Sequence, residues 1–575
     1  MHVGADPFEA VDITLTNFIV KCRASAGVQP LPVTAYQEWK QYIMSQARTY
    51  VADYAHKNGV SVDDIIHPRP NKTRWNSSKD EVYLSKKSLK YLRWLQQYLV
   101  MVPVDKASNN IAFICKRHYI DILRRELTGD EVDSKKDAAY VKSRESADDV
   151  VKRHLTFLKS EYKLEVPDRL PYLYWMPKLH KNPISERFIA ASFQATTTSL
   201  SSILSDCLNK VLDKLREKDD EHIIRTGVRR FFVVKGFEEV SSFLSRWPRR
   251  HTKVKRKLYT GDFSTMYTTI PHADLVQQIR KSLQEAWQFV ADKNKCNSSA
   301  VTLVWSGTIA NAECSWETSK RGGRSRHDSK ERIHQFICND LIEAVTWLID
   351  NTYLVNGDRC SKQQVGIPMG TNAAPPIANL FLYGHESSKI DKLLDEGKLD
   401  VALLFHLTFR LIDDVLSVDN EEFESECSNG LYPASLKLND TSVVPDLEVN
   451  FLGMHIKSID DSIHIDVFDK RREFPFRVVR YPHRPSLIPQ SFPYGVFVGL
   501  LHRYYRICTD EDKFVQNALL LTSMLVKQGW SVQRLRKSFC GFIHSRADSL
   551  RWQCSKKRVL SLYIQQLEAL ERRAE

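Results

Sequence analysis

Three aspartates in this 575-residue chain lie in patterns that suit the binding of divalent metal ions. In the segment KLYTGDF, the side chains of Leu258, Thr260 and Asp262 alternate, so they share one face of a predicted strand. Asp413 and Asp414 are adjacent in FRLIDDVLSV, where apolar residues on both sides predict two strands joined by a tight hairpin. The sequence therefore predicts two strand ends that each present carboxylates.

Adjacent carboxylates repel each other, and a fold retains them when cations neutralise the charge. Oxygen ligands favour Mg²⁺, and phosphoryl transfer uses two such ions about 3.5–4 Å apart. Taken alone, an Asp-Asp pair is more often a solvated turn. The choice between the two readings depends on the surrounding segments.

One such segment is QQVGIPMGTNAAPPIANLFLYGHE, between the two acidic segments. Gly366 and Gly370 bracket a loop that can approach a ligand closely. Asn372 is the predicted N-cap of a helix, with Pro375 and Pro376 in its first turn. The helix then carries an apolar stripe made by Ile377, Leu380 and Phe381.

Composition sets broad limits. The net charge is +13, which suits a polyanionic partner, and hydrophobic residues make up 42% of the chain, as in folded proteins. The eleven cysteines show no zinc spacing, so they are expected to be reduced thiols. No apolar run reaches the length of a membrane span, and the N-terminus does not resemble a signal peptide.

The elements that position these motifs can be predicted from periodicity. Residues 1–95 are expected to be helical, and 99–115 to form two strands joined by a polar turn at Ala107–Asn110. Residues 171–195 are expected to be extended, and 250–460 to alternate strands and helices. An insertion near 290–335, rich in Ser, Gly and basic residues, is expected to be a surface loop. The chain beyond 510 is predicted to be helical and basic.

The order of the motifs carries a resemblance. A strand with aspartate, a GxPxG loop with its helix, and an Asp-Asp hairpin resemble motifs A, B and C of reverse transcriptases. The match is closer to Penelope-like retroelements, whose polymerases resemble telomerase. Supporting segments, which extend the resemblance over residues 98–510, are VPVDKASNN, PKLHKNPISERFIAAS, GIPMGTNAAPPIANLFLY, FLGMHI and VFDKRREFPFRVVRYPHRPSLIPQSFPYGVFVGLLHRYYRIC.

The resemblance implies an α+β fold with the right-hand architecture of polymerases. Residues 1–95 would be a helical extension and 96–250 the fingers. Residues 251–459 would be the palm, including the insertion, and 460–575 the thumb and a helical C-terminal region. The basic side chains expected to hold duplex phosphates on the thumb are Lys470, Arg471, Arg472, Arg477, Arg480, Arg503 and Arg506.

The resemblance also implies roles for single residues. Asp262, Asp413 and Asp414 would be the catalytic metal ligands, with Asp414 the weakest. The incoming dNTP would be bound by Lys178, Arg187, Tyr267 and Gly370, with Tyr267 excluding a ribose 2′-hydroxyl. The chain departs from the family pattern at three positions, which are Ala107 in place of glycine, Leu411 in place of tyrosine, and Met369 in place of the retroviral glutamine.

The function implied is RNA-directed DNA synthesis with two Mg²⁺ ions, for which Mn²⁺ can substitute. Template RNA, a DNA primer and dNTPs would be the partners, without a membrane, and the nucleus is the expected location. The chain ends at RVLSLYIQQLEALERRAE, so a GIY-YIG endonuclease after the thumb is not expected. An RNA-directed RNA polymerase and a non-catalytic RNA-binding scaffold with a polymerase fold are the alternatives.

Overall fold

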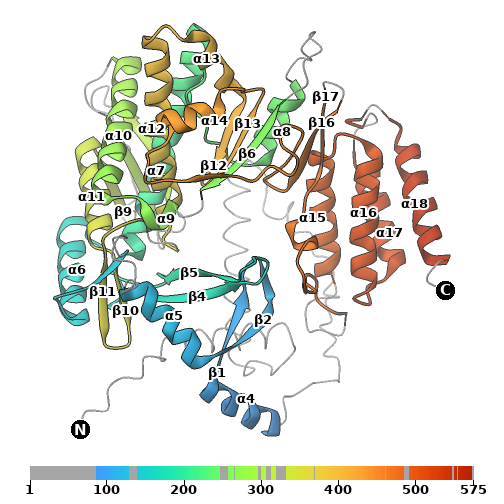
Figure 1. The fold of residues 1–575 in the computed structure, drawn as a ribbon, viewed down its shortest axis with the longest axis horizontal. Coiled ribbons are helices and arrows are strands. Elements are labelled where there is room, and N and C mark those ends of the chain that lie inside the picture. The colour runs from blue at the N-terminus through green and yellow to red at the C-terminus, as the bar shows by residue number, and fades with distance from the viewer. Residues whose placement is uncertain are drawn as a thin grey trace, which may run out of the picture.

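The computed structural model describes residues 86–128, 139–246, 257–263, 266–295, 299–305, 312–318, 332–367, 370–459, 462–484, 491–546, 550–552 and 554–572. Three groups of elements follow each other along the chain (Figure 1). They are an N-terminal group of small sheets, a central sheet covered by long helices, and a C-terminal group of helices. Residues 1–85 of the predicted helical extension and the arginine-rich stretch 319–331 lie outside the described residues.

The N-terminal group contains two antiparallel hairpins. Its elements are α4 (Lys86–Tyr98), β1 (Leu99–Val104), β2 (Ala107–Cys115), α5 (Lys116–Thr128), β3 (Tyr140–Lys142), α6 (Ala147–Tyr162), β4 (Tyr172–Lys178) and β5 (Ser185–Ala191). β1 pairs with β2, and β4 with β5. The turn between β1 and β2 was predicted at Ala107–Asn110, which is wrong. The chain turns at Asp105 and Lys106, where Lys106 has a φ of 58°.

The central group is built on the four-stranded sheet β12-β13-β6-β14. These strands are β6 (Leu258–Phe263), β12 (Thr408–Leu411), β13 (Asp414–Val418) and β14 (Leu438–Asp440). The neighbouring sheet β15-β16-β17 consists of β15 (Glu448–Phe451), β16 (Met454–Ile459) and β17 (Ser462–Val467). Figure 1 shows both sheets in the upper centre of the view.

Long helices and short linking elements complete the central group. They are α7 (Thr198–Thr226), α8 (Phe237–Arg246), α9 (Met266–Thr269), α10 (His272–Asn294), α11 (Cys338–Asp350), α12 (Ala374–Asp395), α13 (Leu399–Leu404), η2 (Phe405–Leu407), α14 (Phe423–Glu426) and η3 (Cys427–Leu431). Leu204, Leu283 and Phe381, from α7, α10 and α12, share one apolar core. α12 is buried on nearly all sides, which explains why IANLFLY is apolar around its whole circumference. The predicted stripe of Ile377, Leu380 and Phe381 is confirmed as buried.

The insertion near 290–335 differs from its prediction. Instead of a plain surface loop, the described part forms a sheet in the order β8-β7-β9, from β7 (Ser299–Trp305), β8 (Glu313–Thr318) and β9 (Arg332–Phe336). Val301, Leu303 and Phe336 join the main core, which is why these strands hold together. A further hairpin, β10 (Tyr353–Asn356) with β11 (Arg359–Gln363), pairs with β3 of the N-terminal group.

The C-terminal group is helical, as predicted. After the short η4 turn (Lys470–Arg472) come α15 (Phe492–Ile507), α16 (Glu511–Val526), α17 (Val532–His544) and α18 (Lys556–Arg572). These helices have their own core, in which Phe514, Phe539 and Tyr563 are fully buried. Among the described residues, no helix is both long and apolar enough to span a lipid bilayer. The described cysteines are free thiols.

Candidate active site

The hairpin formed by β12 and β13 carries two of the three predicted aspartates. β12 ends at Leu411, Ile412 and Asp413 form the turn, and β13 begins at Asp414. Ile412 has a φ of 58°, a conformation that glycine normally supplies at this position of a two-residue turn. The predicted hairpin with its acids at the tip is confirmed, and its turn contains a strained β-branched residue.

The third aspartate lies directly across from this hairpin. In the antiparallel pairing of β13 with β6, Asp414 is the partner of Asp262. The backbone N–H of Phe263 donates to the carbonyl of Asp413 at 3.2 Å, so Asp262 and Asp414 form a non-hydrogen-bonded pair. In such pairs the Cα atoms are about 4.5 Å apart and the side chains approach most closely. The strand register thus brings the three acids together at one end of the sheet.

Burial and repulsion raise the pKa of Asp413 and of Asp414. Asp414 is exposed at the surface, but neighbouring protein displaces much of the water around its carboxylate. This loss of solvation is the larger cause, and repulsion from Asp413 and Asp262 the smaller cause, of a rise in its pKa to about 6. Loss of solvation, with repulsion from Asp262, also raises the pKa of Asp413. Among the described residues, no three acidic, His or Cys side chains are gathered closely enough to be a ready-made metal site. The oxygen-only donors and the repulsion between them nevertheless fit a hard divalent cation.

Lys178 and Arg187 lie on the two strands of the β4–β5 hairpin, and both are close to Asp105. Arg187 donates from Nη1 to Oδ1 of Asp105 at 2.9 Å, and this Asp105 side chain is buried. Arg187 is also close enough to Asp413 to oppose the rise in its pKa. Burial lowers the pKa of Lys178, while the charge of Asp105 opposes that shift. Asp105, which the sequence prediction gave no role, therefore anchors Arg187.

Two further cations face the acids, Lys106 from the quoted segment VPVDKASNN and Lys470 from the residues predicted to bind duplex phosphates. Lys106 in the β1–β2 turn and Lys470 in η4 both act to lower the pKa of Asp414. Burial and repulsion from Lys106 in turn lower the pKa of Lys470, and attraction to Asp262 opposes this shift. Acids from the central sheet thus meet bases from both flanking groups.

The two glycines of the GxPxG loop pack against different segments, Gly366 against Tyr267 and Gly370 against β5. Tyr267 is half-buried on α9, and burial together with repulsion from Asp413 raises its pKa. A Cβ atom at Gly366 would lie 2.2 Å from the carbonyl oxygen of Tyr267, and one at Gly370 would lie 2.4 Å from that of Ala190. Both glycines have positive φ, so the loop is packed against protein backbone on both flanks.

The start of α12 differs in one detail from its prediction. Asn372 was expected to be the N-cap, but the cap is Ala373, whose side chain offers no acceptor. The hydroxyl of Ser201 on α7 accepts from the N–H of Ala373 at 3.0 Å, and Asn372 donates to Ser202 at 2.6 Å. The helix is capped by a neighbouring helix because α7 packs directly against it.

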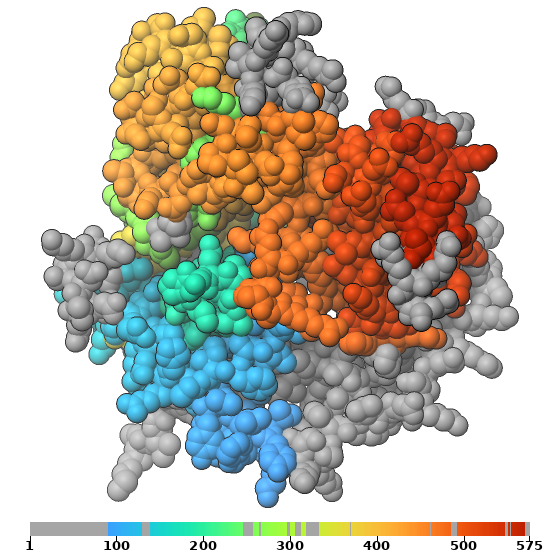
Figure 2. Space-filling view, turned by 45° about the vertical axis from the view of Figure 1, so that its right-hand side comes forward, coloured from blue at the N-terminus to red at the C-terminus, as the bar shows by residue number. Residues whose placement is uncertain are grey.

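The N-terminal group also contacts the segment that leads into the C-terminal helices. With this contact, each of the three groups touches the other two. The side chain of Asn110 donates to the carbonyl of Arg477 at 2.8 Å and accepts from the N–H of Val479 at 2.9 Å. Asn109 donates to the carbonyl of Val479 at 3.1 Å. His180 stacks on Phe474, with ring centroids 4.7 Å apart. In Figure 2 the orange chain carrying residues 474–484 touches the blue and teal N-terminal group, and we call this contact the latch.

The basic residues predicted for duplex binding fall into two sets. Arg471 and Arg480 both pair with Asp469, at 3.0 and 2.7 Å, so their charges are partly neutralised. Lys470, Arg472 and Arg477 are exposed, and Arg472 donates to Asn517 at 3.3 Å. These five residues lie on the chain between β17 and α15, close to the latch.

The other set lies on α15 and faces the central group. Arg503 donates to the carbonyl of Leu452 at 3.1 Å and lies over the ring of Phe237. Arg506 is 3.4 Å from Glu238 on α8. Arg503 and Arg506 therefore make protein contacts at the junction of two groups, a role that the sequence prediction did not foresee.

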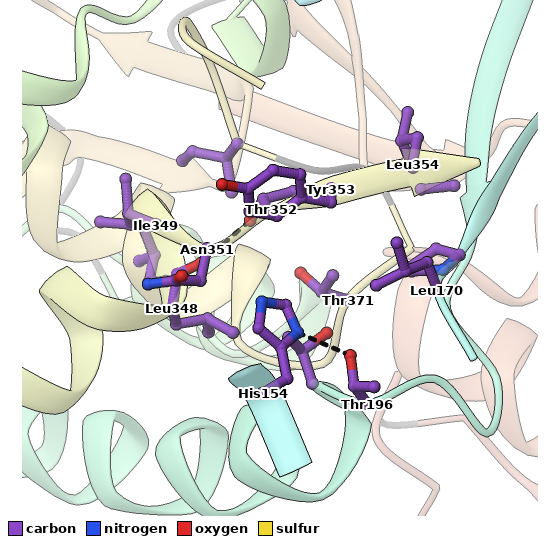
Figure 3. A pocket seen from close by; sticks show the side chains of 15 residues that line it. His154, Leu170, Thr196, Leu348, Ile349, Asn351, Thr352, Tyr353, Leu354 and Thr371 are labelled. Atoms are coloured by element: carbon purple, nitrogen blue, oxygen red, sulfur yellow. Dashed lines mark hydrogen bonds between the residues drawn. The ribbon is translucent and has the colours of Figure 1, made fainter. Parts of the chain in front are cut away.

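A small cavity lies apart from the acids, behind the GxPxG loop. It is lined mainly by apolar side chains, with His154 donating to or accepting from Thr196 at 2.9 Å (Figure 3). Burial lowers the pKa of His154 to about 4. Ile367 and Ile377, which flank the start of α12, also line it. The cavity therefore lies among residues that support the GxPxG loop, and none of the three aspartates lines it.

Comparison with solved structures identifies similar folds. A telomerase from Candida albicans, in complex with a fragment of telomeric RNA, matches with a TM-score of 0.50 and 12% identity over 83% of this chain and 69% of that one. This chain has a nucleic-acid polymerase fold. A telomerase from Candida tropicalis matches with a TM-score of 0.45 and 13% identity over 98% of this chain and 85% of that one.

The polymerase fold is recognised here from structure. Comparison with models of known protein families finds no match, and comparison with curated proteins finds no relative. The predicted α+β class is confirmed by the mixed helix and sheet content together with the structural match.

Proposed function

We propose that this chain is an RNA-directed DNA polymerase of the Penelope-like type, which extends a DNA 3′ end on an RNA template. The observation that carries the proposal is the pairing of Asp262 with Asp414 across β6 and β13, with Asp413 in the adjoining turn. This arrangement occurs within a polymerase fold similar to that of a telomerase. The motif order in the sequence points to the same chemistry.

We expect Asp262 and Asp413 to be the main ligands of two Mg²⁺ ions, with Asp414 the weaker one. When bound, the ions would lower the pKa of the attacking 3′-hydroxyl and neutralise the triphosphate. The carboxylates repel each other in the free protein, so they are poised to accept cations. Their position at the end of a sheet, on two paired strands and the tight turn beside them, would keep the reacting groups in a fixed geometry.

The β4–β5 hairpin would hold the triphosphate. Arg187 uses Nη1 for Asp105, and its partly exposed guanidinium has further N–H donors for phosphate oxygens. Because Asp105 is buried, it fixes the direction in which Arg187 points. Lys178 would add a second positive charge from the neighbouring strand.

Tyr267 would select the sugar. Its backbone is fixed, because its carbonyl accepts from Ile367 at 2.8 Å and packs on Gly366. A fixed ring beside Asp413 would collide with a ribose 2′-hydroxyl, which favours dNTPs over NTPs. Gly370 would contribute by letting the loop approach the nucleotide.

In this proposal the N-terminal group serves as fingers, the central group as palm and the C-terminal helices as thumb. The partners would be template RNA, a DNA primer and dNTPs. The Candida albicans telomerase was solved with an RNA fragment, which supports RNA as a partner. We place the activity in the nucleus, where DNA 3′ ends are available.

A primer-extension assay tests the proposal. Purified protein would receive an RNA or DNA template, a DNA primer, Mg²⁺, and either dNTPs or NTPs. We expect dNTP addition on the RNA template, and loss of addition in the Asp413→Ala variant, which remains folded. Extension with NTPs in preference to dNTPs would indicate an RNA polymerase instead, and RNA binding without any extension would indicate a scaffold.

A further inference from the structure

The largest fully buried side chain in the described part of the protein is a charged one, Arg410 on β12. Neither Arg410 nor its partner Glu386 on α12 is exposed to solvent. Arg410 lies two residues before Ile412, at the base of the hairpin that presents Asp413 and Asp414. A buried charge is retained only where hydrogen bonds compensate its lost solvation, so this pair calls for an explanation.

Every N–H of the Arg410 guanidinium has an acceptor. Nε and Nη2 donate to the two carboxylate oxygens of Glu386, at 2.6 and 2.9 Å. Nη1 and Nη2 donate to the side-chain and backbone oxygens of Asn379, at 2.9 and 3.3 Å. The fifth bond runs from Nη1 to the backbone carbonyl of Ile412, at 3.2 Å. A lysine could not reproduce this planar set of donors.

The fifth bond connects the buried pair to the strained turn. Ile412 has a φ of 58°, which a β-branched residue adopts only when its surroundings impose it. By fixing the carbonyl of Ile412, Arg410 holds the peptide that directly precedes Asp413. Arg410 is itself fixed by backbone hydrogen bonds, since its N–H donates to Phe232 at 2.8 Å and its carbonyl accepts from Val234 at 2.9 Å.

Glu386 extends the same connection to the other acidic strand. The hydroxyl of Tyr432 donates to Oε1 of Glu386 at 3.0 Å. The ring of Tyr432 packs edge-on against Phe263, with centroids 4.8 Å apart, and Phe263 directly follows Asp262. One buried ion pair therefore bonds directly to the neighbour of Asp413 and reaches the neighbour of Asp262 through Tyr432.

We infer that Arg410 and Glu386 are positioning residues that set the spacing of the Asp262, Asp413 and Asp414 carboxylates for divalent-ion binding. This inference rests on the proposed function, because it assigns the acids to metal ions. Neither residue touches substrate, and both act through backbone that carries the acids. A pair that served stability alone would not need a bond to the strained turn, and its removal would not change ion affinity in a folded protein.

The test is Mn²⁺ binding to the protein without nucleic acid or nucleotide, measured by electron paramagnetic resonance of the free ion. The variant is Arg410→Lys, which keeps the charge but loses the bond to Ile412. We expect Mn²⁺ affinity to fall about tenfold or more, as for other groups that orient metal ligands. Arg230→Lys is the matched control, because buried Arg230 pairs with Asp391 on the same helix at 3.0 Å without touching the hairpin.

A second substitution separates positioning from stability. Ile412→Gly removes the strain, since glycine adopts positive φ without cost. Added to Arg410→Lys, it should restore Mn²⁺ affinity to within about threefold of the natural protein, although it adds no contact to the core. If Arg410→Lys fails to fold, Glu386→Gln, which keeps the shape and one acceptor, takes its place in the same pair of measurements.

Three results would overturn the inference. They are unchanged Mn²⁺ affinity in folded Arg410→Lys, an equal loss in Arg230→Lys, and no recovery on adding Ile412→Gly. A different result would contradict the proposed function. Mn²⁺ binding that depends on Asp262, in a protein unable to extend any primer, would contradict that function, whereas intact binding in Arg410→Lys contradicts only the inference.

Discussion

Asp262 on β6 and Asp414 on β13 face each other as a non-hydrogen-bonded pair, the closest approach that two antiparallel strands provide. Like charges placed directly opposite each other destabilise a sheet. The sheet therefore carries a repulsion that Lys106 and Lys470 offset only in part, since the pKa of Asp414 remains raised.

This repulsion predicts opposite effects of one substitution on stability and on activity. In metal-free buffer at pH 7.5, Asp414→Asn should raise the free energy of unfolding by about 0.5–1 kcal/mol. Nucleotide addition should fall strongly, because a ligand is lost. Thermal or urea unfolding with a chelator, beside primer extension with Mg²⁺, measures both. A variant that is less stable than the natural protein, or one that extends primers normally, would refute the assignment.

If the ring of Tyr267 excludes a ribose 2′-hydroxyl, its removal should weaken the preference for dNTPs over NTPs. Tyr267→Ala should raise incorporation of NTPs relative to dNTPs by at least about tenfold, which corresponds to about 1.4 kcal/mol in the competing barriers. Tyr267→Phe is the control, because it keeps the ring and removes only the hydroxyl. The measurement is single-nucleotide addition with matched dNTP and NTP. The proposed role of Tyr267 is disproved if the alanine variant keeps the NTP-to-dNTP ratio of the natural protein.

The two sets of basic residues predict different salt dependence of duplex binding. Replacing Lys470 and Arg477 together with Gln should lower the slope of log affinity against log salt by about two, one for each lost phosphate contact. Replacing Arg503 and Arg506 with Gln should leave the slope nearly unchanged, because both already contact the central group. The slopes come from titrating a labelled RNA–DNA duplex at several salt concentrations. The reverse pattern would place the duplex against α15.

We expect the buried imidazole of His154 to make the folded protein less stable in acid. Burial lowers the pKa of its imidazole to about 4 in the folded protein, against an ordinary value near 6.5. The unfolded chain therefore binds more protons between these two values, and stability is lost as the pH falls from about 6.5 to about 4. The loss from this one group is on the order of 3 kcal/mol at most.

The measurement is urea unfolding at several pH values for the natural protein and for His154→Asn. Asparagine can keep a polar contact with Thr196 but does not titrate in this range. We expect the variant to show a shallower loss of stability between pH 6.5 and 4. Identical pH profiles would show that another group causes the acid sensitivity.

Much of the candidate site could be predicted from sequence, because local patterns encode it. The hairpin at Asp413–Asp414, the strand with Asp262, the helix after Gly370 and the extended segments of β4 and β5 all follow from alternation and turn residues. The strand register then brings the acids together, because two short strands can pair in only a few ways. The roles of Tyr267, Lys178 and Arg187 remain predictions drawn from resemblance.

What sequence analysis missed depends on contacts between distant segments. Asp105 and Arg187 are far apart in the chain, as are Glu386 and Arg410, so no local pattern connects them. One signal was available, because an arginine within the apolar strand TFRL requires a buried partner. The strands in the insertion were missed because its basic composition outweighed the alternation of Val301 and Leu303.

The latch has a consequence for how a substrate could enter. The bonds from Asn109 and Asn110 to residues 477–479 join the N-terminal group to the segment before α15, so the contacts around the acids form a closed circuit. If the proposed template binds inside this circuit, a linear RNA would have to enter by a free terminus. A covalently closed circle could not be threaded, and would engage only after these few hydrogen bonds and the Phe474 cluster separated. The same closure would slow escape of a threaded strand, so that many additions could follow a single encounter.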